Sequence, residues 1–183
     1  MNEHARNFIT HLVRLHEQDR RAIAVLRRSL SFPPGKYPPA YPYVERFVGA
    51  DRHEADPFRL ALYLVAGLFA LHPHNAPCRL AASLGELMFR RGSDSIEKRF
   101  IALLGADADN LEEYLRQIVT LLAADDCGLD YVALLNDLPY WLNPNATDKR
   151  DQIRQRWARD FYGALMARDV KPEPTTSSNN VNN

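Results

Sequence analysis

Apolar residues recur every three or four positions along most of the chain, and this period predicts α-helices. The first such segment, residues 4–30, carries one apolar face made by Phe8, Leu12, Leu15, Ile23, Leu26 and Leu30. Residues 58–71 differ, because their large apolar side chains fall on all sides of the helix. That pattern is typical of a helix buried at the centre of a bundle. No segment alternates apolar and polar residues as a strand does, so the sequence predicts an all-α fold.

Five further amphipathic helices follow the central one, over residues 79–90, 94–105, 109–124, 129–141 and 147–167. In the last of them Ile153, Trp157, Phe161 and Leu165 share one face. We therefore expect Trp157 and Phe161 to anchor the core and not to serve as platforms for stacking bases.

Residues 94–105 are predicted to form a short amphipathic helix that carries two adjacent cations. Asp94 and Glu97 have the spacing of a capping box, and Gly105 marks the expected end. Lys98 lies nearly opposite the apolar face and Arg99 on its flank. A solvated surface helix is the ordinary interpretation of two adjacent exposed cations, and a helix that presents them to an anion is the alternative.

The segment 32–42 holds five of the twelve prolines and predicts an extended, non-helical crossover over the surface. The capped helices before and after about residue 92 indicate a compact bundle of two packed helical subdomains, residues 1–92 and 93–170. Residues 171–183 are rich in Pro, Thr, Ser and Asn, which predicts a disordered tail.

Charge is balanced overall but unevenly distributed. The chain has 23 Lys and Arg and 23 Asp and Glu. Residues 1–92 hold 13 cations and 8 anions, whereas residues 93–183 hold 10 cations and 15 anions. A basic half and an acidic half favour head-to-tail association of copies.

The residues that most enzymes need are not arranged for catalysis in this sequence. Cys78 and Cys127 are isolated, which suits a reducing cytoplasm, and we expect neither an export signal nor a membrane span. His72-Pro-His74, followed by Cys78, invites a metal interpretation, but no second ligand pair follows at the spacing of a zinc site. We predict a helix-ending turn there, no metal, no cofactor and no enzymatic activity.

What recurs instead is a pair of cations near a helix end, at residues 27–28, 90–91, 98–99 and 149–150. Arginine beside aromatic residues suits phosphate contacts and base stacking without sequence preference. The residues alone leave two hypotheses open, a nucleic-acid-binding protein and a protein-interaction subunit.

Several stretches in order resemble the CasB family, the small subunit of the type I-E Cascade surveillance complex of CRISPR systems. They cover the chain from about residue 10 to residue 165: Leu26-Arg-Arg-Ser29, the loop Tyr37 to Tyr43, Leu64-Val-Ala-Gly-Leu-Phe-Ala-Leu-His-Pro73, Ser83-Leu-Gly85, Ser95-Ile-Glu-Lys-Arg-Phe100, Leu115-Arg116, Leu129-Asp-Tyr131 and Arg156-Trp-Ala-Arg-Asp-Phe-Tyr162.

The resemblance implies an all-helical, non-enzymatic subunit that pairs head to tail with a second copy. It also implies contacts with other Cascade subunits, the CRISPR RNA and the target DNA, including its displaced strand. The family's basic positions correspond here to Arg27, Arg28, Lys98, Arg99, Arg116, Lys149, Arg150 and Arg154. The competing hypothesis is a structural spacer, in which these cations meet acidic faces of neighbouring subunits and touch no nucleic acid.

Overall fold

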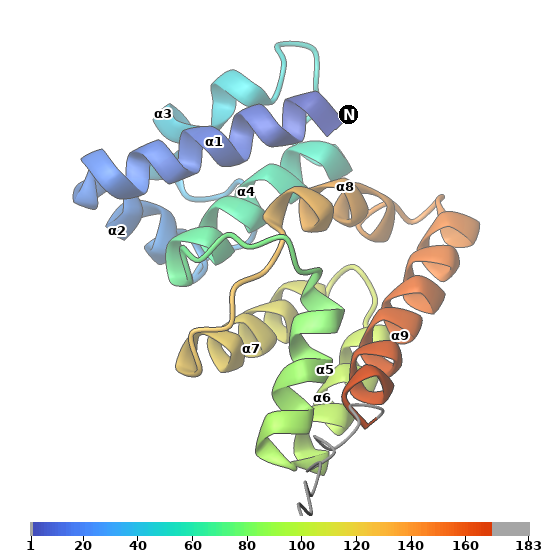
Figure 1. The fold of residues 1–183 in the computed structure, drawn as a ribbon. Coiled ribbons are helices and arrows are strands. Elements are labelled where there is room, and N and C mark those ends of the chain that lie inside the picture. Colours follow the sequence, from blue (N-terminus) through green and yellow to red (C-terminus); the bar gives the residue numbers. More distant parts are fainter. Residues whose placement is uncertain (1, 170–183) are drawn as a thin grey trace, which may run out of the picture.

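The computed structural model describes residues 2–169; the tail predicted at residues 171–183 lies outside the described residues. The helices in chain order are α1 (Asn2–Gln18), α2 (Arg20–Ser29), α3 (Tyr41–Val44), α4 (Pro57–Leu71), α5 (Leu80–Arg91), α6 (Asp94–Gly105), α7 (Leu111–Ala124), α8 (Tyr131–Trp141) and α9 (Thr147–Asp169) (Figure 1). Extended pairing within residues 2–169 is limited to one isolated bridge between Asn75 and Leu129. The predicted all-α fold is confirmed.

The first apolar stretch forms two helices where the sequence pattern predicted one. Asp19 interrupts it with φ −138° and ψ 86°, and its carboxylate accepts a hydrogen bond from the backbone N–H of Ala22. This side chain offers the backbone an alternative partner and starts a new helix. The periodicity continues across the break, which is why it did not reveal the bend.

The proline-rich segment is more helical than predicted. It ends with the 3-10 turn η1 (Pro38–Ala40) and the first residues of α3, and the 3-10 turn η2 (Glu45–Phe47) follows directly. Proline is tolerated in the first turn of a helix, where its missing N–H would lack a partner in any case. Arg59 of α4 fixes the segment, because its guanidinium binds the carboxylate of Glu45 at 2.5 Å and lies against the backbone at Gly35.

Helix α4 occupies the centre of the upper half, as its all-round apolar pattern predicted. It packs against α2 and α8, and Gly67 lets α2 come close, since a Cβ there would meet Leu30 at 2.6 Å. Substituting Gly67 would therefore require Leu30 to move.

In the lower half, the long helix α9 packs along α5 (Figure 1). The ring of Phe161 stacks on that of Phe100 with centroids 4.2 Å apart. Gly85 of α5 faces the backbone of α9, where any side chain would collide with the carbonyl oxygen of Phe161. Trp157 is 4% exposed and Phe161 is fully buried, so their prediction as core anchors is confirmed.

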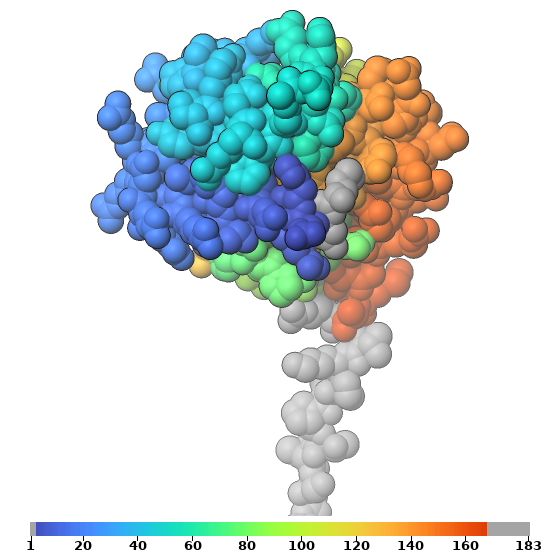
Figure 2. Space-filling model, turned by 90° about the horizontal axis from the view of Figure 1, so that it is seen from above, coloured from blue at the N-terminus to red at the C-terminus, as the bar shows by residue number. Residues whose placement is uncertain are grey.

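The packing does not follow chain order. Helix α5, which precedes residue 92, packs on α6, α7 and α9, whereas α8, which follows it, packs on α1 and α4. Figure 2 shows residues from the first third of the chain beside those of α8 and α9 on one face. The packing groups thus cross the boundary expected near residue 92, and the division into two subdomains stays a prediction.

The residues that precede α6 and α7 differ by one position from the acidic residues expected there from the sequence. Ser93, not Asp94, precedes α6, and Asn110, not Asp109, precedes α7; neither helix has a side-chain cap hydrogen bond. Asp94 instead lies in the first turn of its helix, where a carboxylate favours the positive end of the helix dipole. Helix α6 ends at Gly105, as predicted.

Candidate nucleic-acid interface

Arg27 and Arg28 lie in the last turn of α2, and both side chains are exposed. The Nε of Arg27 donates a hydrogen bond of 2.8 Å to the carbonyl oxygen of Ala70, near the end of α4. This bond uses one of the five guanidinium N–H donors and holds the stem of the side chain. Four donors and the full positive charge of Arg27 remain directed to the exterior.

Arg116 of α7 reaches the same region from another direction. Its Nη1 donates to the carbonyl oxygen of Leu30, the residue that ends α2, at 3.2 Å. Arginine next to the C-terminal carbonyls of a helix is favoured by the helix dipole. Arg27 and Arg116 therefore each bind the terminal carbonyls of a neighbouring helix, and both remain exposed.

Arg99 of α6 completes the group. Arg99 and Arg116 together line a shallow hollow of about 480 Å³ with Leu71, the neighbour of Ala70. Lys98 and Arg99 are both exposed, and neither forms an ion pair with any residue between 2 and 169. We call the five cations Arg27, Arg28, Lys98, Arg99 and Arg116 the junction surface.

The structure brings three of these predicted residues together from three helices. Arg27 binds the carbonyl oxygen of Ala70, and Arg99 and Arg116 line a hollow with the adjacent Leu71, so the three cations lie around the end of α4. Arg28 and Lys98 are the exposed sequence neighbours of two of them. We therefore treat the pairs 27–28 and 98–99 as one surface, and its binding of nucleic acid stays a prediction.

Arg20 extends the junction surface, and the sequence analysis left it out. It lines a second hollow, of about 380 Å³, with Arg27 and His16. The signal was the seven-residue spacing from Arg20 to Arg27, which places both on the same side of a helix.

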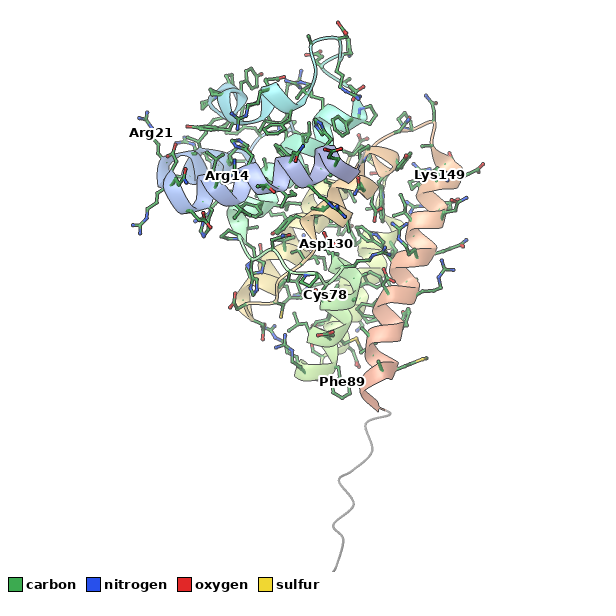
Figure 3. All side chains as sticks on the ribbon, turned by 45° about the horizontal axis from the view of Figure 1, so that its top comes forward. Arg14, Arg21, Cys78, Phe89, Asp130 and Lys149 are labelled. Atoms are coloured by element: carbon green, nitrogen blue, oxygen red, sulfur yellow. The ribbon has the colours of Figure 1, made fainter. Side chains whose placement is uncertain are left out.

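The third predicted group, Lys149, Arg150 and Arg154, lies elsewhere. Figure 3 places Lys149 at the start of α9, on the opposite side of the molecule from Arg14 and Arg21. The Nζ of Lys149 donates to Oε1 of Gln152 of its own helix, at 3.4 Å. Arg150 is half-buried, and its Nε has no hydrogen-bond partner among the described residues.

Arg154 is used inside the fold. Its Nη2 donates to the carbonyl oxygen of Ala106 at 2.7 Å, and its guanidinium carbon lies 5.4 Å from the ring centroid of Trp141. Asp151 is 3.5 Å away on the same helix. Its neighbour Arg156 binds Asp137, which also accepts a hydrogen bond from the indole of Trp157. Carbonyl and carboxylate partners thus meet the terminal nitrogens of Arg154 and Arg156 near the core aromatics, whereas the buried Nε atoms of both have no hydrogen-bond partner among the described residues.

The tandem pair Arg90-Arg91 is also engaged internally. Arg90 contacts the thiol of Cys127 at 2.5 Å, and Arg91 forms an ion pair with Asp125. The pair therefore joins the end of α5 to the turn after α7, a role that the sequence could not distinguish from ligand binding.

A larger cavity, of about 530 Å³, lies beside the junction surface. The proline-rich segment and α7 line it, with Phe32, Lys36, Glu112 and Arg116 among its residues. Burial raises the pKa of Glu112 to about 7, although the positive charge of Arg116 acts in the opposite direction. Glu112 is thus partly protonated near neutral pH and offsets the charge of Arg116 less than an ordinary carboxylate would.

No helix in the described part of the chain is long and apolar enough to cross a membrane.

Comparison with known proteins identifies relatives along most of the chain. Residues 22–162 match the family described as CRISPR-associated protein Cse2. A curated protein of that name from Thermus thermophilus is 45% identical over 154 residues, which cover 82% of this chain and 83% of the relative.

Solved structures give the same picture. The crystal structure of a Cse2-family protein from Thermus thermophilus is 43% identical, has a TM-score of 0.73 and covers 87% of this chain and 97% of the other. CasB from M. ruber is 31% identical with a TM-score of 0.74 over 91% of this chain and 96% of the other. A chain of a CRISPR RNA-guided surveillance complex shares the fold at 22% identity, with a TM-score of 0.76 over 93% of this chain and 99% of the other.

Proposed function

This chain belongs to the CRISPR-associated Cse2 family, and on that premise we propose that it is a non-catalytic small subunit of a type I-E Cascade complex. In this role it binds the backbone of nucleic acid through the junction surface and stabilises the R-loop during antiviral defence. Its partners are the other Cascade subunits, the CRISPR RNA and the target DNA with its displaced strand. The protein acts in the cytoplasm, where foreign DNA is met.

The single observation that carries this proposal is the convergence of Arg27, Arg99 and Arg116 from three helices on one exposed area. The bonds of Arg27 and Arg116 to helix-terminal carbonyls limit the motion of their side chains. Fixed cations lose less conformational freedom on binding a phosphate than mobile ones do. Phosphate contacts of this kind position a strand and carry no base information.

We assign Lys149, Arg150 and Arg154 a different place in this proposal. Arg154 stabilises the packing of α9, and Lys149 and Arg150 are secondary contacts for nucleic acid, because they lie at the start of α9, which carries none of the five cations of the junction surface.

Head-to-tail pairing of two copies fits the uneven charge of the chain, whose first half carries the excess of cations and whose second half carries the excess of anions. Such pairing would place two junction surfaces along one strand. The zero net charge predicts weak binding by the isolated protein, with the assembly raising the effective concentration of strand and surface.

The alternative is a purely structural spacer whose cations bind acidic faces of other subunits. Reconstitution separates the two. The variant Arg27→Ala/Arg28→Ala/Lys98→Ala/Arg99→Ala is assembled with the remaining subunits, and both incorporation and R-loop lifetime are measured. Normal incorporation with a shortened R-loop lifetime supports nucleic-acid binding. Failure to incorporate, with the variant folded, supports the spacer.

A further inference from the structure

The loops that follow α4 and α7 are joined by a dense set of hydrogen bonds. The backbone N–H of Leu129 donates to the carbonyl oxygen of His74, and that of Ala76 donates to the carbonyl oxygen of Leu129, at 3.1 and 3.0 Å. The hydroxyl of Tyr131 donates to the carbonyl oxygen of His72 at 2.6 Å, and Ser83 donates to that of Gly128 at 2.8 Å. Two segments some 50 residues apart in sequence are therefore held as one rigid unit.

Three metal-binding side chains project from this unit. His72, His74 and Asp126 each offer one ligand atom, and these atoms all lie within 4.8 Å of one another. Bonds between the loops hold the backbone of His72 and His74, and the N–H of Asp126 bonds to the carbonyl oxygen of Ala123 within its own turn, so little ordering is needed to gather the side chains. Preorganisation of this kind favours binding of a cation.

The two histidines differ in burial, and each already has a defined partner. His72 is 5% exposed, and its Nε2 lies 2.8 Å from the carbonyl oxygen of Cys127. Because a carbonyl can only accept, Nε2 carries the proton and Nδ1 carries the lone pair. A histidine with one nitrogen bound to a backbone carbonyl is the usual arrangement for a metal ligand, because that bond fixes the tautomer and the ring.

His74 and Asp126 lie at the surface and provide an entry path. Their side chains are 45% and 86% exposed, and Nδ1 of His74 is 2.9 Å from Oδ1 of Asp126. A hydrogen bond now joins these atoms, and a metal ion can replace the shared proton with a small widening of the pair. Asp126 has a φ of 51°, a left-handed backbone conformation that few non-glycine residues adopt.

We propose that His72, His74 and Asp126 form a binding site for a divalent transition-metal ion of the Zn²⁺ class, with water completing the coordination. Two imidazole nitrogens and one carboxylate suit Zn²⁺, Co²⁺ or Ni²⁺, whereas Mg²⁺ prefers oxygen ligands throughout. The ion links the loop after α4 to the turn after α7. The proposal does not depend on nucleic-acid binding, because the ligands lie outside the junction surface.

The sequence analysis predicted no metal here because no second ligand pair follows at the spacing of a zinc site. The third ligand comes from Asp126, 52 residues beyond His74, and only the fold brings it close. The spacing His-Pro-His supplied two ligands of the set and gave no indication of the third.

The test is calorimetric titration of the tag-free full-length protein with ZnCl₂, with thermal melts at saturating Zn²⁺ and after addition of a chelator. We expect one ion per chain and a melting temperature that rises with Zn²⁺ and returns on chelation, since a ligand bound only by the folded state stabilises it. MgCl₂ should give neither effect.

The two surface ligands are replaced in separate variants, His74→Ala and Asp126→Asn. Asparagine tolerates the left-handed backbone at residue 126, so this variant is expected to fold. Each should weaken Zn²⁺ binding by at least about tenfold. His16→Ala, at an exposed histidine of α1, should bind as the unmodified protein does.

Absence of saturable Zn²⁺ binding by the unmodified protein overturns the proposal. Equal affinity in the His74→Ala and Asp126→Asn variants overturns it as well, because the ion would then lie elsewhere.

Discussion

The start of α9 and the junction surface each carry several arginines and lysines but use them differently. At the start of α9, Arg154 and Arg156 direct their guanidiniums inward to the carbonyl oxygen of Ala106 and to Asp137. On the junction surface, Lys98 and Arg99 are exposed and have no ion-pair partner within residues 2–169. Arg27 and Arg116 each bind one carbonyl there and keep their remaining donors accessible.

The difference follows from what each helix packs against. Helix α9 lies along α5 and beside α8, so cations near its apolar face meet the indole of Trp141 and the carboxylate of Asp137. The cations of α2, α6 and α7 lie on outward faces or at helix ends, where Arg27 and Arg116 bind terminal carbonyls and Glu112, beside Arg116, has its pKa raised by burial. A cluster of cations in a sequence thus predicts a binding surface only where the fold leaves the charges without internal anions.

The largest expected loss of stability follows from substituting the buried aromatic residues of α9. Phe161→Ala and Trp157→Ala should each lower the free energy of unfolding by about 3–5 kcal/mol, because they leave cavities in a close-packed core. Chemical denaturation of the folded variants measures this loss. A variant that keeps its stability but loses affinity for nucleic acid would show that the aromatic side is itself a binding surface, and the comparison would fail.

Replacing one cation of α9 and one cation of the junction surface tests the comparison directly. Arg154→Ala should lower the free energy of unfolding by about 1–2 kcal/mol, since it removes a charged hydrogen bond to Ala106 and the contact with Trp141. The matched control is Arg99→Ala, which should change stability by less than about 0.5 kcal/mol because that side chain is exposed. Equal losses in denaturation of the two variants would contradict the distinction between packing and surface cations.

Glu112 provides a pH test beside the junction surface. Its pKa is raised by burial to about 7 in the folded protein, above the value of about 4.5 for an unperturbed glutamate. The folded state therefore holds this proton more tightly than the unfolded state. Its contribution to stability is present below about pH 4.5 and is lost as pH rises through about 7.

Replacing this carboxyl with an amide removes the titration. Glu112→Gln should accordingly be more stable than the unmodified protein at pH 8, by about 1 kcal/mol after allowance for solvent screening, and little different at pH 5. Thermal melts at the two pH values give the comparison. A variant that is less stable at pH 8 would show that ionised Glu112 is held by Arg116 and not penalised by burial.

Most of the architecture was accessible from the sequence, because the apolar period survives wherever a helix packs on a core. The central position of α4 and the burial of Trp157 and Phe161 follow from that period. The bend at Asp19 was missed, since a capping side chain can end one helix and start the next without disturbing the apolar spacing. The helical turns of the proline-rich segment were missed because proline signals a boundary but tolerates a first turn.

The sequence predicted that the candidate site would consist of arginine and lysine, but it did not predict which of these residues lie together in the fold. Arg27, Arg99 and Arg116 come from separate helices, and their proximity depends on how α2, α4, α6 and α7 meet. The helical wheel placed Arg154 beside Trp157 and could not tell whether its guanidinium met a ligand or an internal carbonyl. The contact between Arg154 and Ala106 joins residues 48 positions apart, which no local pattern encodes.

The central claim is that the junction surface binds the phosphates of a single strand. The most direct measurement is the salt dependence of affinity for single-stranded DNA, compared among the unmodified protein, the variant Arg27→Ala/Arg28→Ala/Lys98→Ala/Arg99→Ala and the matched variant Lys149→Ala/Arg150→Ala. Thermal melts should show that the fourfold variant loses at most about 1–2 kcal/mol, since its four side chains are exposed and Arg27 gives up its hydrogen bond to the carbonyl oxygen of Ala70.

Removing one cation that binds a phosphate should reduce the slope of log affinity against log salt by about 0.7. The fourfold variant should therefore bind more weakly, to a similar degree for all base sequences, and with a clearly shallower slope, while the α9 variant keeps nearly the slope of the unmodified protein. Equal slopes in the unmodified protein and the fourfold variant would contradict the account and leave the structural spacer as the function of this subunit.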